Sequence, residues 1–166
     1  MGNYYYAVRR NAFETKFIAD SMLGKLTKWL RIAGVDVEYK KDITDEELIK
    51  RANSEGRVIL TRDRFVVKRK ATQDYLLIWG NYLREQLEEF FQVFRLDTLD
   101  SAFTRCIRCN LPLKAMERDE ARYRVPIYVW ETQEEFKSCP SCLRIYWSGT
   151  HREHAERFLK EVIESF

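Results

Sequence analysis

Short hydrophobic runs and amphipathic stretches alternate along the first part of the chain. Four segments are strand-like, because they hold neighbouring apolar residues or alternate apolar with polar ones. They span 16–19, 35–39, 57–60 and 75–79. The runs VIL and YLLIW have no polar face, which is typical of strands that are buried on both sides.

Apolar residues recur at helical spacing between these segments. From 22 to 33 they form one face, and Gly34 is placed to end that helix as a left-handed cap. Thr44 and Glu47 have the spacing of a capping box before a second helix, which runs to about Asn53. Further helices are expected at 83–94 and 155–166.

The repeated strand–helix order predicts an α/β domain of three layers, with a mainly parallel sheet covered by helices on both faces. We expect this domain to span 1–100, with 1–15 as an N-terminal extension in which three tyrosines at 4–6 could add an edge strand. The remainder, 101–166, is expected to be a small ribbon followed by a C-terminal helix. Within it, 127–130 has the composition of a strand.

Composition excludes several classes of protein. The chain has 166 residues, of which 45% are hydrophobic and 33% charged, so it is globular rather than disordered. No apolar run approaches the roughly 20 residues that span a bilayer, and the first residues lack the apolar core of a secretory signal. We therefore expect a cytoplasmic protein without membrane contact. A net charge of +3 neither requires nor excludes nucleic acid.

Four cysteines form two C-x-x-C pairs separated by a longer segment, which is the spacing of a tetrahedral zinc site. They are Cys106, Cys109, Cys139 and Cys142. We expect one structural zinc per chain, with a strand or hairpin of a ribbon between the pairs. Two disulfides or a redox motif are the alternatives. Since protein would fill all four positions, such a zinc would have no open site for catalysis.

Acidic residues follow two of the predicted strands. Asp20 and Asp63 come at strand ends, and Asp42, Asp45 and Glu46 lie at the start of the second helix. In a parallel sheet these positions share one edge, where ligands bind. Several carboxylates together suit Mg²⁺ or Mn²⁺ and metal-assisted hydrolysis of a phosphodiester. For each acid alone, capping of the following helix is the competing interpretation.

Basic residues surround these acids. Six basic residues and one acid between 57 and 70 give that stretch a charge of +5. Lys25, Lys28 and Arg31 are expected on the polar face of the first helix. Such a surface suits a polyanion, and a solvated face is the alternative.

Several of these motifs together resemble the Mut-seven C-terminal RNase domain family. They are FIADSMLGKLTKWLRIAGVDVEY, DITDEELIKRANSEGRVILTRDR, CIRC, VPIYVW and FKSCPSCLRIYWSGTH. The resemblance extends from about Lys16 to His151. It implies a PIN-like ribonuclease fold with a C-terminal zinc ribbon, and metal-dependent cleavage of RNA.

The resemblance also implies roles for particular acids. Asp20 and Asp63 match the first and last acids of the family, and both are expected to hold Mg²⁺ or Mn²⁺. Asp45 matches the middle acid best, with Asp42 and Glu46 as possible substitutes. Asp74 is too close to the start of a strand to serve as a fourth acid.

Lys25, Arg62, Arg64 and His151 are the candidate RNA-binding residues. His151 could instead position the final helix, and Tyr146 and Trp147 could either stack on bases or belong to the core. Besides a metal-dependent ribonuclease, which could form a homodimer, two hypotheses remain open. One is a non-catalytic RNA-binding or ribosome-associated adaptor, and the other is the toxin of a toxin–antitoxin pair.

Overall fold

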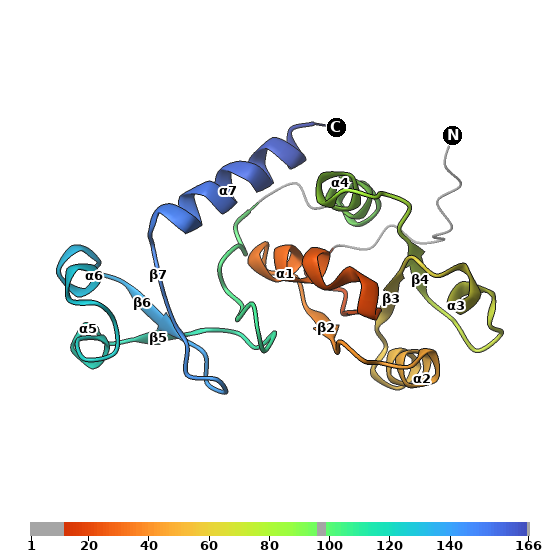
Figure 1. Ribbon diagram of the computed structural model, residues 1–166, viewed down its shortest axis with the longest axis horizontal. Coiled ribbons are helices and arrows are strands. Elements are labelled where there is room, and N and C mark those ends of the chain that lie inside the picture. The colour runs from red at the N-terminus through yellow and green to blue at the C-terminus, as the bar shows by residue number, and fades with distance from the viewer. Residues whose placement is uncertain (1–11, 96–98, 166) are drawn as a thin grey trace.

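A computed structural model describes residues 12–95 and 99–165 (Figure 1). The tyrosines at 4–6 lie outside these ranges. The first part contains β1 (Phe17–Ala19), the 3-10 helix η1 (Ser21–Leu23), α1 (Gly24–Ile32), β2 (Val37–Tyr39), α2 (Asp45–Glu55), β3 (Val58–Thr61), α3 (Arg64–Lys68), β4 (Tyr75–Leu77) and α4 (Leu83–Phe94). The second part contains β5 (Lys114–Met116), α5 (Arg118–Ala121), α6 (Ile127–Thr132), β6 (Phe136–Ser138), β7 (Ile145–Trp147) and α7 (Thr150–Ile163).

The first four strands form one parallel sheet in the order β2-β1-β3-β4. Ala19 of β1 lies opposite Tyr39 of β2 on one side and Leu60 of β3 on the other. The chain adds β2 on one side of β1 and then crosses to add β3 on the other side. The ends of β1 and β3 are therefore the topological switch point of the sheet, which is the usual ligand position in open α/β folds.

Helices cover both faces of this sheet, as the sequence predicts. Phe17 and Ala19 point to one face, where α1, α4 and α7 contribute to the larger core. Ile18 and Ile59 point to the other face and pack against α2 and α3. Phe17 is enclosed by aromatic rings of α4, with its centroid 4.7 Å from that of Phe94.

The predicted helix ends are present in the structure. Gly34 follows α1 with a φ of 95°. The Thr44 side chain caps α2, because its Oγ1 accepts a hydrogen bond from the Glu47 backbone N–H at 3.2 Å. The Glu47 carboxylate accepts hydrogen bonds from Lys40. The short helices α3 and α5 carried no sequence signal that we recognised.

The second part is a three-stranded antiparallel sheet in the order β5-β6-β7. The strand expected at 127–130 is wrong, because this segment is helix α6. Pro126 precedes the helix and fixes its entry, and only one face of α6 is buried, where Val129 packs with Met116 and Phe136. Tertiary packing therefore overrides the strand propensity of Ile-Tyr-Val-Trp.

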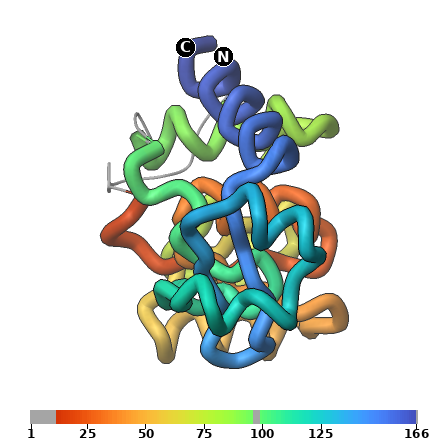
Figure 2. Tube along the Cα trace, turned by 90° about the vertical axis from the view of Figure 1, so that its left-hand side faces the viewer, coloured from red at the N-terminus to blue at the C-terminus, as the bar shows by residue number. Residues whose placement is uncertain are grey.

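Helix α7 leaves the ribbon and runs back over α1 and α4 (Figure 1, Figure 2). Leu159 and Val162 join the core of the parallel sheet, and the Phe158 ring lies edge-on to Trp29 at 4.7 Å. Arg84 of α4 donates a hydrogen bond to the Glu161 carbonyl. In the part of the chain that the structure describes, no helix is both long and apolar enough to cross a membrane.

Candidate functional site

Two predicted acids lie at the switch point of the parallel sheet. Asp20 directly follows β1, and its N–H extends the pairing by donating to the Leu60 carbonyl at 3.0 Å. Asp63 follows the end of β3 and caps α3. Since β1 and β3 are neighbours, the fold brings both acids to the same edge.

The Asp20 carboxylate is held firmly. It is only 7% exposed. Its Oδ1 accepts from the Met22 N–H at 2.8 Å, and its Oδ2 accepts from the Arg62 N–H at 3.0 Å. The Thr61 hydroxyl also bonds to Oδ2. An ionised carboxylate has about four acceptor positions, so about one remains for another ligand.

Thr61 connects the two acids. Its hydroxyl donates to Asp20 and accepts a hydrogen bond from the Asp63 N–H at 2.9 Å. The Asp63 Oδ1 accepts from the Phe65 N–H at 2.7 Å, and the side chain is more accessible than that of Asp20. Thr61 was missed in the sequence, although a hydroxyl residue at the end of a buried strand, two residues before an acid, was a usable signal.

Of the other three acids, two are paired with Arg69 and one is exposed. Asp45 starts α2, and its Oδ2 lies 3.0 Å from an Arg69 nitrogen, while Glu46 lies 3.7 Å from the same guanidinium. Asp42 is exposed between β2 and α2. Within 12–95 and 99–165, only the cysteines form a group of three or more potential ligands with all donor atoms within 4.8 Å. No three carboxylates of these described residues come together so closely.

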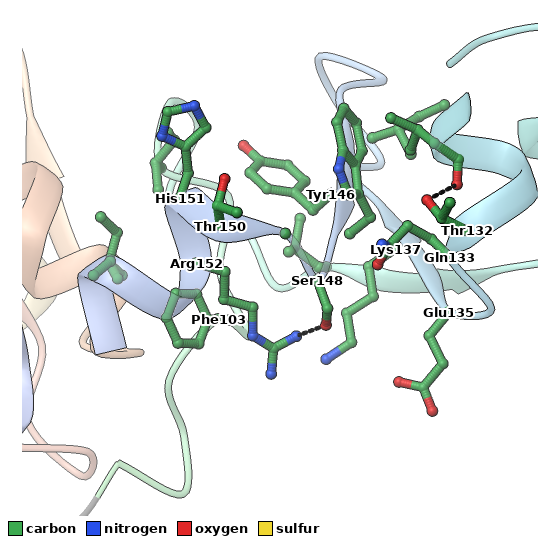
Figure 3. A pocket seen from close by; sticks show the side chains of 18 of the residues that line it. Phe103, Thr132, Gln133, Glu135, Lys137, Tyr146, Ser148, Thr150, His151 and Arg152 are labelled. Atoms are coloured by element: carbon green, nitrogen blue, oxygen red, sulfur yellow. Dashed lines mark hydrogen bonds between the residues drawn. The ribbon is translucent and has the colours of Figure 1, made fainter. Parts of the chain in front are cut away.

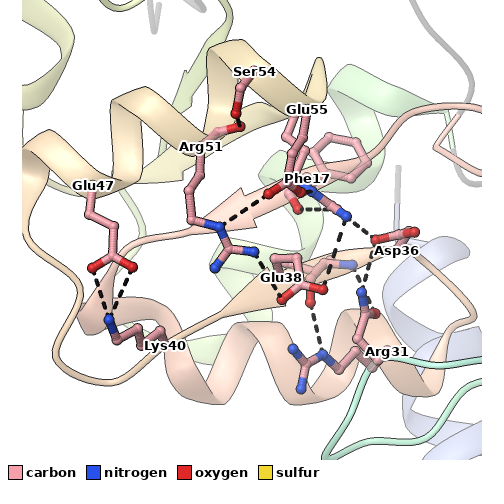
Figure 4. A network of polar contacts seen from close by, with 12 residues as sticks. Phe17, Arg31, Asp36, Glu38, Lys40, Glu47, Arg51, Ser54 and Glu55 are labelled. Carbon is pink, nitrogen blue, oxygen red and sulfur yellow. Dashed lines mark hydrogen bonds and ion pairs between the residues drawn. The ribbon is translucent and has the colours of Figure 1, made fainter.

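The basic residues divide into a surface group and a structural group, and Arg31 of the structural group is drawn with its polar network in Figure 4. Lys25 and Arg64 are exposed, and Arg62 donates to the Asn81 Oδ1 at 2.7 Å. Arg31, expected on a polar face, is 5% exposed and donates to the carbonyls of Val37, Ile107 and Arg108. Burial lowers the pKa of Arg31, although Glu38 and other acidic groups oppose this effect.

Arg57 is likewise structural. It donates to the Asp36 Oδ1 at 2.7 Å and to the Glu55 Oε2 at 2.6 Å. Burial alone would lower the pKa of Arg57, but these two carboxylates outweigh burial and raise it. Arg57 and Arg31 therefore stabilise the fold and leave the basic surface to residues nearer the acids.

Exposed aromatic residues border the acidic edge, and sequence reasoning missed them. Phe65, Trp79 and Tyr82 are 76%, 48% and 73% exposed. The backbone N–H of Phe65 donates to the Asp63 carboxylate, and the Arg64 guanidinium lies 4.5 Å from the centroid of the Trp79 ring. Large exposed apolar side chains gathered in one region are typical of a binding surface, and aromatic rings beside arginines suit the stacking of single-stranded bases.

The cysteines lie together at the base of the ribbon, where each C-x-x-C forms the same turn. Cys106 donates through its N–H to the Leu111 carbonyl, and Cys139 does the same to Arg144. The residue after each pair has a left-handed backbone conformation, with φ of 64° at Asn110 and 57° at Leu143. All four thiols are free, and their sulfurs lie within 4.8 Å of one another.

The spacing of the sulfurs suits one tetrahedral ion. The Sγ atoms of Cys106 and Cys142 are 3.7 Å apart. Zn–S bonds of about 2.3 Å at tetrahedral angles place sulfurs about 3.8 Å apart. These four cysteines could therefore bind zinc, and they are not arranged as disulfides.

Hydrogen bonds favour ionisation of one of these thiols. Burial opposes a charge on Cys106, but hydrogen bonds from the Tyr146 hydroxyl and nearby backbone N–H groups lower the pKa of that thiol to about 6. The hydrogen bond with Cys142, together with the nearby Cys106, raises the pKa of Cys109 to about 11. Four thiolates repel one another without a cation, and a bound metal removes this cost.

His151 lies far from the acids in the structure. It is exposed in the first turn of α7 and lines a cavity beside Tyr146 and Arg152 (Figure 3). Neither Asp20 nor Asp63 lines this cavity. The ribbon and α3 lie at opposite ends of the molecule (Figure 1).

The family described as the Mut7-C RNAse domain matches residues 15–159, nearly the whole chain. No curated protein and no solved structure gives a significant match.

Proposed function

Because the chain belongs to the Mut7-C RNAse domain family, we propose that it is a metal-dependent ribonuclease that hydrolyses phosphodiester bonds at the edge formed by Asp20 and Asp63. Family membership supports ribonuclease activity and an RNA substrate. The observation that supports the position of the site is that the acids follow the two central strands, where the Thr61 hydroxyl bonds to both the Asp20 carboxylate and the Asp63 backbone N–H.

Asp20 and Asp63 would hold a Mg²⁺ or Mn²⁺ ion. Both supply hard oxygen ligands and keep acceptor positions beyond their protein hydrogen bonds. The ion would supply an activated water and stabilise the charge of the transition state. Asp45 would complete the set if its bond to Arg69 opened, and Asp42 or Glu46 would be its substitute.

The residues around the acids would hold the RNA strand. Lys25, Arg62 and Arg64 provide positive charge for the phosphates. Trp79 and Tyr82 provide exposed rings on which unpaired bases could stack. This combination favours a single-stranded substrate over a duplex.

The four cysteines would bind one structural zinc. The two pairs present their sulfurs from matching turns, and the ribbon has a small core centred on Phe136 and Val129. A sheet of three short strands gains stability from such an ion. Removal of zinc is expected to unfold the ribbon.

Cleavage of labelled single-stranded RNA in the presence of Mn²⁺ tests the assignment of the acids. Asp63→Asn removes a ligand charge but keeps an oxygen that can accept the Phe65 N–H. We expect its rate to fall by about a hundredfold or more, the scale of losing one electrostatic contact to the transition state. Asp20→Asn should show the same loss.

Asp119→Asn is the matched control, because this exposed acid lies on α5 in the ribbon. Circular dichroism and zinc content should be equal in all variants. If Asp63→Asn and Asp20→Asn cut RNA at the wild-type rate, the site is not at this edge. If no protein cuts RNA, although all bind it, the non-catalytic adaptor is the better assignment.

A further inference from the structure

A cavity of about 530 Å³ lies where the ribbon meets the first turn of α7 (Figure 3). Residues from both faces of β7 line it, since Tyr146 points to one side of this edge strand and Ile145 and Trp147 to the other. Its volume falls in the range of sites for small molecules, about 300–1,000 Å³. None of the predicted catalytic acids contributes to it.

Aromatic rings form much of the wall of this cavity. They belong to Phe103, Tyr128, Tyr146 and Trp147. Tyr128 and Trp147 are exposed to solvent there. Phe103 has a φ of 60°, an uncommon conformation for a bulky residue, and such backbone strain gathers at ligand sites.

Positive charge lies beside these rings. Lys137 in β6 is directly opposite Tyr146 in the ribbon sheet. Arg152 stacks over Phe103 at 4.7 Å and donates to the Ser148 hydroxyl at 2.8 Å. The lysine and arginine head groups point to the same side of the cavity (Figure 3).

Most of this charge is available to a ligand. Among the residues that the structure describes, Lys137 has no ion-pair partner, and Glu135 is the only acid in the lining. The other lining arginine, Arg105, is already bonded to the carbonyls of Gly34 and Asn110. The N-terminus of α7, a helix of 14 residues, adds its positive end to the cavity through Thr150 and His151.

We propose that this cavity binds one nucleotide unit, with its base against the aromatic rings and its phosphate held by Lys137 and Arg152. A nucleotide combines the two features that the cavity complements, a flat aromatic group and a nearby anion. The unit could belong to an RNA strand, a source that rests on the proposed function, or to a free nucleotide. The site would then engage RNA at a distance from the acidic edge.

Titration calorimetry without Mg²⁺ or Mn²⁺ tests this proposal. The protein carries Asp63→Asn, and the ligands are adenosine and uridine 5′-monophosphates and a single-stranded RNA. Lys137→Ala and Tyr128→Ala are each expected to weaken binding roughly tenfold, the scale of one lost base stack or phosphate contact. Lys114→Ala is the control, since it removes the same charge from neighbouring β5 outside the cavity.

The two ligand types identify the source of the nucleotide. If Lys137→Ala and Tyr128→Ala weaken binding of the monophosphates, the ligand is a free nucleotide. If these variants weaken binding of the RNA but not of the monophosphates, the ligand is a unit of the strand. If neither ligand loses more affinity in Lys137→Ala and Tyr128→Ala than in Lys114→Ala, at equal zinc content, the proposal is overturned. These measurements involve no cleavage, so failure of the catalytic assignment leaves them valid.

Discussion

Gly34 and Gly56 both have left-handed backbones, with φ of 95° and 62°, but only Gly34 is crowded. A Cβ at Gly34 would overlap the Ser101 carbonyl oxygen, whereas a Cβ at Gly56 would meet nothing within 4 Å. Gly34 therefore permits both the end of α1 and the close approach of the segment that leads into the ribbon.

An alanine at Gly56 would introduce only backbone strain, whereas an alanine at Gly34 would add a steric clash. Gly56→Ala should lower the free energy of unfolding by roughly 1 kcal/mol, the cost of a left-handed alanine. Gly34→Ala should lower it by at least about 3 kcal/mol, because the Ser101 backbone must also move. Urea unfolding followed by fluorescence measures both. Equal losses would show that the Ser101 segment moves freely.

At the scale of elements, a polar network joins the parallel sheet to the ribbon. Asp36, just before β2, accepts hydrogen bonds from Arg57 at 2.7 Å and from Asn110 at 2.8 Å. Asn110 also accepts the Val37 N–H, so the first cysteine turn is bonded directly to β2. Burial raises the pKa of Asp36, but the bonds from Arg57 and Asn110 outweigh it and lower that pKa below its usual value.

Asp36→Asn should therefore cost about 2 kcal/mol of stability at pH 7, because it removes the more buried of the two carboxylates that bond to Arg57. A lowered folded-state pKa means that ionised Asp36 stabilises the fold above the unfolded pKa of about 3.9. This contribution is lost as pH falls through the folded-state pKa. Urea unfolding measures the difference in free energy of unfolding between Asp36→Asn and wild type. This difference should be similar at pH 7 and pH 5 and smaller at pH 3.

Glu47→Gln is the control for that measurement, because it removes the more exposed pair with Lys40. Such surface pairs contribute about 0–1 kcal/mol. A difference between Asp36→Asn and wild type that stayed constant down to pH 3 would contradict the assigned role of the charge.

Elements with a repeated local signal could be predicted from the sequence. Runs such as VIL and the Gly34 cap specify their own structure, and the β1 and β3 ends placed Asp20 and Asp63 on one edge. The prediction of a strand at 127–130 was wrong, because burial of Val129 in the ribbon core is not a local property of the sequence. The prediction that Arg31 lies on a polar face was wrong for the same reason, since its carbonyl partners at Ile107 and Arg108 are far away in the sequence.

At the scale of the whole molecule, α7 connects the two parts. It begins beside the ribbon and buries Leu159 and Val162 in the core of the parallel sheet. Phe158→Ala removes the edge-on contact with Trp29 and should cost about 2–3 kcal/mol. Urea midpoints from tryptophan fluorescence measure the loss. Tyr123→Ala, which truncates an exposed ring on the ribbon, should have little effect, and an equal effect of both would argue against docking of α7.

The position of α7 in the chain also sets an order of events during translation. The faces of α1 and α4 that α7 covers are synthesised before the ribbon, and α7 follows the second cysteine pair. Domains fold as units while the chain emerges from the ribosome. The apolar surface under α7 therefore stays uncovered until both cysteine turns have been synthesised. Metal capture by the nascent chain can thus precede closure of the core.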